Sequence, residues 1–119
     1  MSIPVDLTAL EQLVATLGSE ALLITVADHS RPHVVSVLAS WTDHAITMGA
    51  GRRSAHNVGA RPDVTLMWTA PHDEHYRLIV DGTAHTTESG RIIVTPTTAV
   101  LHRIAGSGDP DIPTCLPVG

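Results

Sequence analysis

The sequence predicts a mainly β protein with a minor α component, folded as a six-stranded antiparallel barrel with two short helices. Short segments rich in Val, Ile and Leu recur along most of the chain, and residues that favour turns separate them. The 119 residues can bury one hydrophobic core, and the 43% apolar content is typical of a globular domain. Short strands leave exposed edges unless the sheet closes, so we expect a barrel.

The N-terminal segment is expected to be an amphipathic helix over residues 6–17. Apolar side chains recur there at helical spacing, at Leu7, Leu10, Val14 and Leu17. Thr8 and Glu11 have the spacing of a capping box, and Gly18 can end the helix.

Three strands of a meander are expected next, followed by a short helix. The strands cover residues 21–27, 33–40 and 45–48, with turn-forming residues in the two connections. The helix covers residues 54–61, because Ser54 is a good N-cap residue and Pro62 disfavours helical geometry in the residue before it.

The second half of the chain is expected to supply three more strands. They cover residues 64–69, residues 76–86, and a last strand in two parts, 91–95 and 99–104. Gly82 suggests a β-bulge or a close contact in the middle of its strand. Pro96 interrupts the last strand and requires a sheet edge or a bulge, because proline has no amide hydrogen to donate.

Residues 1–106 are therefore interpreted as the folded domain and residues 107–119 as a C-terminal tail. The tail is rich in Pro and Gly and has no periodic apolar face. The single cysteine, Cys115, lies in it and has no partner for an internal disulfide. We expect this thiol to be inert, because a cysteine nucleophile needs a base beside it.

Charge and hydropathy exclude two classes of partner. The formal net charge is −5, with seven basic residues that are all arginine, so no broad positive field would attract nucleic acid. No apolar run approaches the length that crosses a bilayer, and the first residues lack the pattern of a signal peptide. We therefore expect a cytoplasmic protein that binds neither nucleic acid nor membrane.

The segment most informative about function is residues 49–57, Gly-Ala-Gly-Arg-Arg-Ser-Ala-His-Asn. Its glycines expose backbone amides, and Arg52 and Arg53 precede a helix whose N-terminus carries partial positive charge. These features suit a phosphate monoester. A solvated loop whose arginines bind nothing would show the same pattern, and the motif alone does not choose between the two.

In their order, these elements resemble the pyridoxamine-phosphate-oxidase-like split-barrel family. The resemblance runs from about residue 7 to residue 104. Its most specific parts are the arginine-containing turn, Asn57, the helix exit Arg61-Pro62-Asp63-Val64, and Asp81-Gly82-Thr83-Ala84. It implies a homodimer that holds FMN, or in actinobacterial branches a deazaflavin, in a groove between subunits. The implied function is flavin-dependent oxidoreduction of a small molecule by hydride transfer.

The resemblance also implies site residues. Arg52, Arg53 and Ser54 would contact the cofactor phosphate, and Asn57 would support that turn. The residues flanking the ring or ribityl chain would be Val35, Ser36, Met48 and Gly49, and Trp68 would line the groove. No catalytic side chain is assigned, since in such enzymes the cofactor performs the hydride transfer and the protein supplies position and electrostatics.

Two departures from the family keep other functions open. Ser54 and His56 stand where relatives commonly have basic residues, and the stretch from 86 to 90 lacks a helical insertion that many relatives carry. One alternative is a deazaflavin-dependent reductase. Another is a non-catalytic member that binds or stores a ligand, with or without a cofactor. A third is a barrel that serves as an interaction module, with no flavin ancestry.

The remaining polar and aromatic residues are expected to have structural or surface roles. The loop His72-Asp73-Glu74-His75 holds metal-ligand residue types, but a strong metal signature needs more ligands at defined spacing, so no metal site is expected. His29 and His33 are expected at the surface beside a turn. Trp41 and Trp68 are expected as anchors of the core or of a dimer interface.

Overall fold

A computed structural model of the chain describes residues 2–106. The predicted C-terminal tail and Cys115 lie outside the described residues. The strands are β1 (Ser2–Pro4), β2 (Glu20–Val26), β3 (Pro32–Thr42), β4 (Ala45–Gly49), β5 (Asp63–Trp68), β6 (Tyr76–Thr86) and β7 (Arg91–Arg103). The helices are α1 (Leu10–Leu17) and α2 (Arg52–Ala60), with short 3-10 turns at Leu7–Ala9 and Asp28–Ser30.

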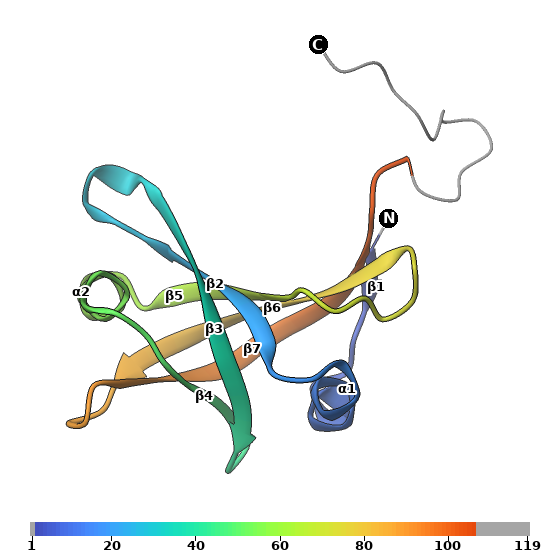
Figure 1. Cartoon of the computed structure of the whole chain (residues 1–119), viewed down its shortest axis with the longest axis horizontal. Helices are drawn as coiled ribbons and strands as arrows, with labels where there is room; N and C mark the ends of the chain where they lie inside the picture. Colours follow the sequence, from blue (N-terminus) through green and yellow to red (C-terminus); the bar gives the residue numbers. More distant parts are fainter. Residues whose placement is uncertain (1, 107–119) are drawn as a thin grey trace.

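Six antiparallel strands close into a barrel in the order β7-β4-β3-β2-β5-β6, and β6 pairs back to β7. The long strand β7 makes this closure, because it pairs along its length with β6 and also at its start with β4. Figure 1 shows the strands crossing one another steeply, as the strong coil of a small barrel requires. The predicted six-stranded barrel and its two helices are therefore confirmed.

One strand was not predicted. The strand β1 pairs with residues 100–102 of β7, beyond the part of β7 that β4 reaches. It has only three residues, all exposed, and one of them is Pro4. Nothing in so short a segment distinguishes a strand from an extended terminus, and only the position of β7 makes the pairing available.

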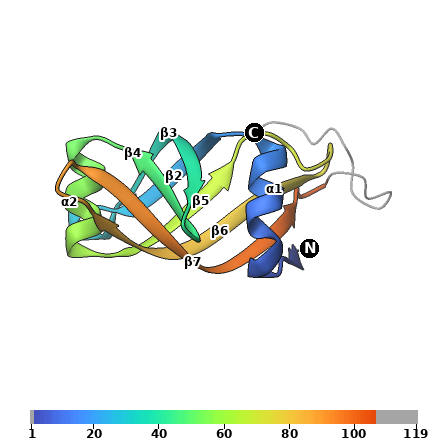
Figure 2. The same cartoon turned by 90° about the horizontal axis from the view of Figure 1, so that it is seen from below.

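The core fills the barrel with side chains that alternate along each strand. In β2 the inward residues Ala21, Leu23 and Thr25 are buried, and β5 contributes Val64, Leu66 and Trp68 in the same way. The helix α1 adds Leu10, Val14 and Leu17. Figure 2 shows α1 and α2 toward opposite ends of the barrel.

The bulge expected around Gly82 and Pro96 is present. Asp81 pairs with Thr98 whereas Gly82 pairs with Pro96, so β7 has one additional residue at this point. A Cβ atom on Gly82 would lie 2.5 Å from the backbone oxygen of Thr95, so the close approach of the two strands requires glycine.

Both helices begin differently from the prediction. The Asp6 carboxylate accepts from the backbone N–H of Thr8 and caps the 3-10 turn Leu7–Ala9, whereas α1 follows with Ala9 at its N-cap position, so the predicted Thr8 and Glu11 capping box is wrong. Gly18 ends α1 at a φ of +90°, as predicted. The helix α2 starts at Arg52 with the extended Gly51 as its N-cap, so the prediction of Ser54 as the N-cap is also wrong.

Candidate functional site

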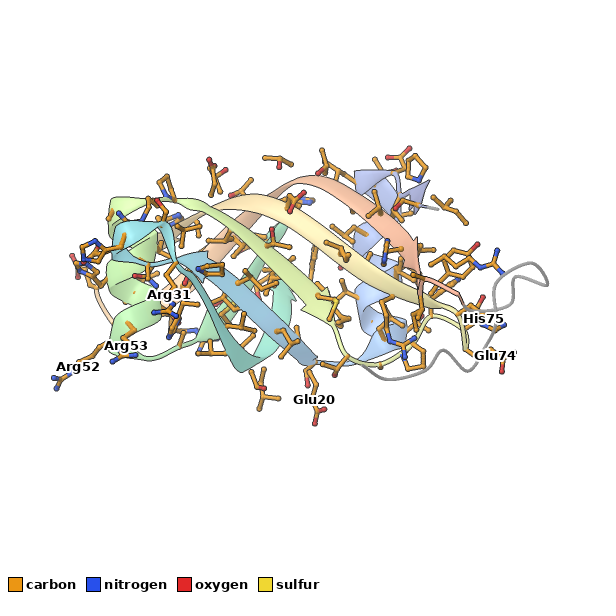
Figure 3. The ribbon with its side chains drawn as sticks, turned by 90° about the horizontal axis from the view of Figure 1, so that it is seen from above. Glu20, Arg31, Arg52, Arg53, Glu74 and His75 are labelled. Carbon is orange, nitrogen blue, oxygen red and sulfur yellow. The ribbon has the colours of Figure 1, made fainter. Side chains whose placement is uncertain are left out.

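A cavity of about 440 Å³ lies between the β2–β3 turn and α2. We call it the arginine cavity, and its lining residues are Ala27, Asp28, Arg31, Pro32, His33, Arg52, Arg53, His56 and Asn57. It combines two segments that are about twenty residues apart in sequence, one from the turn and one from the first half of the helix. Figure 3 shows Arg31, Arg52 and Arg53 gathered at one end of the barrel, opposite the end that carries Glu74 and His75.

The three arginines of this cavity are all exposed, and within residues 2–106 none of them forms a salt bridge or a side-chain hydrogen bond. Arginine presents five N–H donors in a planar fork that matches phosphate and carboxylate groups. Three such groups around one cavity, without a protein acceptor for any of them, form a set of donors suited to an anion.

The N-terminus of α2 adds backbone donors. No side chain caps this helix, and its first intrahelical hydrogen bond, from Ala55 to Gly51, leaves the amides of Arg52, Arg53 and Ser54 without intrahelical acceptors. The helix dipole adds partial positive charge at the same point. A phosphate at this position would accept from amides that the protein leaves uncapped.

Two buried polar atoms close to this region lack hydrogen-bond partners. They are the Oγ of Ser54, whose side chain is only 1% exposed, and the Nδ1 of His33. Buried polar atoms are nearly always satisfied in folded proteins, so unpaired ones point to a missing ligand or water. Both flank the donor set described above, and this chemistry fits a phosphate group.

The one carboxylate in the lining is already neutralised. Arg61 Nη2 lies 2.7 Å from Asp28 Oδ1, and the ring nitrogen Nε2 of His56 lies 3.3 Å from Oδ2. Arg61 first, and then His56, lower the pKa of Asp28 below its ordinary value by stabilising the charged form. Asp28 therefore stays ionised near neutral pH, but its charge is shared with Arg61 and opposes an incoming anion only weakly.

The turn that carries Arg31 has an unusual backbone. His29 and Ser30 have φ angles of 67° and 63°, in the left-handed region that non-glycine residues seldom adopt. Two hydrogen bonds close the turn, from the N–H of Ala27 to Arg31 and from the N–H of Ser30 to Ala27, at 2.7 and 3.1 Å. The Arg31 backbone is thus held directly beside Ala27 at the mouth of the cavity.

Asn57 connects the helix to the barrel. Its side chain is buried, and Nδ2 donates to Thr25 Oγ1 at 3.0 Å. Thr25 is an inward residue of β2, so this bond fixes the orientation of α2 against the strand that leads into the turn. Asn57 therefore connects the two walls of the arginine cavity.

A second cavity, of about 680 Å³, lies on the outer face of the barrel. We call it the outer cavity, and its lining residues are Glu20, Ala21, Ser36, Val37, Leu38, Ser40, Gly49, Thr69 and Arg91. It contains Ser36 and Gly49, two of the residues that the resemblance places beside the cofactor ring. Val35 lies between the two regions on β3, half-buried and packed against the core.

Two predicted site residues are corrected by the structure. Met48 and Trp68 are fully buried, because both fall on the inward rows of their strands. The indole Nε1 of Trp68 donates to the Gly18 carbonyl at 3.0 Å, which satisfies its one polar atom inside the protein. The core interpretation of Trp68 is the one observed, and neither side chain reaches a cavity.

Sequence reasoning missed the lining residues Asp28, Arg31 and His33. The first two lie in the predicted connection between residues 27 and 33, and His33 is predicted at the surface beside that turn. Their only sequence signal is the concentration of charged residues in the loop between two apolar strands. No local pattern places that loop beside α2, because the Asn57 to Thr25 hydrogen bond that joins them spans 32 positions.

The His72 to His75 loop forms local contacts. The Asp73 carboxylate accepts from the His75 N–H at 2.7 Å, and Glu74 lies 3.1 Å from the His75 ring. Within the described range, no group of three His, Cys, Asp or Glu side chains is arranged to hold a metal ion. In the same range, no helix has both the length and the apolar content that spanning a membrane requires.

Comparisons with known proteins bear on the fold and the family. No family model matches the chain. Over 123 residues the chain is 37% identical to an uncharacterized protein of Mycobacterium bovis, covering 88% of this chain and 84% of that protein. An uncharacterized protein of Mycobacterium tuberculosis matches with the same identity and coverage.

Solved structures match at lower identity. The FAD binding protein of Mycobacterium smegmatis is 18% identical with a TM-score of 0.62, covering 87% of this chain and 100% of that one. An F420 reductase is 19% identical with a TM-score of 0.57, covering 68% and 88%. HutZ, a heme storage protein of Vibrio cholerae, is 13% identical with a TM-score of 0.61, covering 81% and 93%.

These comparisons identify the fold and the family. The chain has the split-barrel fold of the pyridoxamine-phosphate-oxidase-like proteins, which confirms the fold that the sequence resemblance implied. It belongs to the same family as the two mycobacterial proteins.

Proposed function

We propose that this protein binds a flavin-type cofactor, with the cofactor phosphate in the arginine cavity, and acts as an oxidoreductase on a small molecule. The observation that carries the proposal is the pair of exposed arginines, Arg52 and Arg53, which have no side-chain acceptor within residues 2–106 and stand at the uncapped N-terminus of α2. Structural neighbours named as an FAD binding protein and an F420 reductase support it. FMN is the first cofactor to test, and a deazaflavin is the alternative.

The phosphate end of the site is formed by the first turn of α2. Arg52 and Arg53 supply charged donors and the uncapped amides supply neutral ones. The unpaired hydroxyl of Ser54 is a further donor in this turn. Asn57 keeps the helix in place through Thr25, so the donors are held in position before the ligand arrives.

The ring end of the site is assigned to the outer cavity. Ser36 and Gly49 line it, and the charged residues Glu20 and Arg91 stand at its edge. A bound flavin or deazaflavin supplies the hydride chemistry, while the chain supplies position, local charge and exclusion of water. The substrate would bind beside the ring in the same cavity.

The oxidoreductase is proposed to be a homodimer. Along β3 the outward side chains Val34, Ser36, Leu38 and Ser40 form one row, in which Val34 is 53% and Leu38 is 65% exposed. Exposed apolar side chains on a sheet face are typical of an interface. Because Ser36 and Leu38 also line the outer cavity, a second copy packed on this row would cover the ring end of the site.

A non-catalytic, ligand-storing function is the second candidate. It is favoured by Ser54, which provides a hydroxyl where related proteins commonly have a basic residue, and by the likeness to a heme storage protein. The two candidates differ in whether bound cofactor turns over. A storage protein would bind its ligand, but the bound ligand would not be reduced and reoxidised in a catalytic cycle.

The first experiment is the visible absorption spectrum of the purified protein, alone and with FMN or deazaflavin added, together with its mass in solution. We expect a bound-flavin band on a dimer, loss of that band when an electron donor reduces the flavin, and its return when an added electron acceptor reoxidises it. Leu38→Glu should convert the dimer to a monomer, whereas Thr83→Glu, on an exposed position of β6, should not. A colourless monomer that takes up neither cofactor would contradict the proposal.

A further inference from the structure

The arginine cavity is larger than a single phosphate requires. Its volume is about 440 Å³, whereas a water molecule occupies roughly 30 Å³ of liquid and a phosphate group fills the space of a few waters. Arg52 and Arg53, with the amides of the first turn of α2, already supply enough donors for one phosphate. Arg31, from the β2–β3 side, lines the same cavity.

Arg31 comes from a separate wall of the cavity. It follows the β2–β3 turn, and no acceptor within residues 2–106 bonds its guanidinium. A third unpaired guanidinium on a second wall suits a second anionic group that is covalently linked to the first.

The turn holds Arg31 in place at an energetic cost. The left-handed backbone of His29 and Ser30 is unfavourable for residues that carry a Cβ atom. Such backbone outliers are frequent at ligand sites, where the surrounding structure maintains them. Here the maintaining contact is the 2.7 Å hydrogen bond between the Ala27 N–H and the Arg31 carbonyl.

The local electrostatics also favour a ligand of higher charge. Asp28 is the only carboxylate in the lining, and Arg61 compensates it at 2.7 Å without itself lining the cavity. The three cavity arginines are therefore not balanced by local negative charge. His33, at the start of β3, also lines the cavity, and its buried Nδ1 has no hydrogen-bond partner within residues 2–106.

We propose that Arg31 is a third anion-binding residue and that the arginine cavity selects ligands with two adjacent phosphates over ligands with one. This rests on the proposed function, because it assumes that Arg52 and Arg53 bind the first phosphate. A flavin that carries a diphosphate would therefore bind more tightly than the mononucleotide FMN.

The test measures binding to the full-length protein by calorimetry, with inorganic pyrophosphate against orthophosphate and with FAD against FMN. The inorganic pair removes any contribution from adenosine. We expect pyrophosphate to bind about tenfold more tightly than orthophosphate, which corresponds to about 1.4 kcal/mol. Arg31→Ala should abolish that ratio while changing orthophosphate affinity less than about twofold, and Arg31→Lys should restore part of it.

The matched control is Arg77→Ala. Arg77 lies two residues after His75, which Figure 3 shows at the end of the barrel opposite Arg31, Arg52 and Arg53, and its Nη1 donates to the neighbouring Tyr76 carbonyl. This variant should leave every affinity unchanged. Thermal unfolding of Arg31→Ala should match wild type, because its exposed side chain contacts no acceptor.

The possible outcomes separate this inference from the proposed function. If flavin and phosphate bind but the pyrophosphate preference is missing, or survives in Arg31→Ala, the role of Arg31 is overturned and the proposed function stands. If neither phosphate nor any flavin binds, both fail. If the preference exists and Arg31→Ala removes it, the diphosphate assignment is established.

Discussion

The barrel interior and the arginine cavity differ in whether their polar side chains have hydrogen-bond partners. In the interior, the one polar atom of Trp68 is bonded to Gly18, and Asn57 is bonded to Thr25. At the cavity, three guanidiniums and the Nδ1 of His33 have no hydrogen-bond partner within residues 2–106, and neither has the buried hydroxyl of Ser54 in the first turn of α2. The difference indicates that the interior supplies stability, while the α2 end keeps unsatisfied donors for a ligand.

The largest effect should come from breaking the interior. Replacing Trp68 by alanine removes a fully buried ring and should lower the free energy of unfolding by about 3 to 5 kcal/mol. Chemical denaturation measures this. Trp68→Phe keeps most of the volume and should cost about 1 kcal/mol through the lost bond to Gly18. Flavin affinity of the Phe variant should equal that of wild type, and a large loss would mean that the ring reaches the ligand.

A substitution at the arginine cavity should affect ligand binding rather than stability. Replacing both Arg52 and Arg53 by alanine should weaken flavin binding by about 1.5 to 3 kcal/mol for each charged hydrogen bond lost. The free energy of unfolding should stay within about 0.5 kcal/mol of wild type, because both side chains are exposed and unpaired. Titration with FMN, followed by fluorescence, measures the first quantity. If the double variant binds FMN with unchanged affinity, the cofactor phosphate does not bind at Arg52 and Arg53.

A smaller effect is expected at the bulge between β6 and β7. Gly82→Ala places a methyl group against the Thr95 backbone and should destabilise the protein by about 1 to 3 kcal/mol. Gly59→Ala is the matched control, since a Cβ at this position of α2 meets no atom within 4 Å. It should stabilise the helix by about 0.5 to 1 kcal/mol. If the two variants have equal melting temperatures, β6 and β7 can move apart at little energetic cost to make room for the methyl group.

The smallest effect concerns the neutralised carboxylate. Because the pKa of Asp28 is lowered from 3.8 in the folded protein, its stabilising contribution is present above pH 3.8 and is lost as the pH falls through the folded value. Asp28→Asn should therefore be slightly less stable than wild type at neutral pH, and the two should converge in acid. Asp63→Asn, which removes another exposed carboxylate, serves as the control for net charge. If Asp28→Asn is still less stable than wild type in acid, the ion pair with Arg61 is not the cause of the difference in stability.

Much of the fold could be predicted because its determinants are local. Alternating apolar residues identify strands such as β2 and β5, and Gly18 identifies the end of α1, since these signals act over a few neighbouring residues. Gly82 and Pro96 each indicated the bulge independently, because one lacks a side chain and the other lacks an amide hydrogen. The three residues of β1 carry no such signal.

The candidate site was only partly predictable, for a physical reason. The sequence by itself determined the barrel and the placement of the arginine pair and Asn57 in one segment at the start of a helix, because each depends on residue types at short spacing. Only the tertiary structure decided that Met48 and Trp68 face the core and that Arg31 lies with Arg52 and Arg53 around one cavity. Those outcomes depend on how strands pair and how α2 packs on β2, which are contacts between residues far apart in the chain.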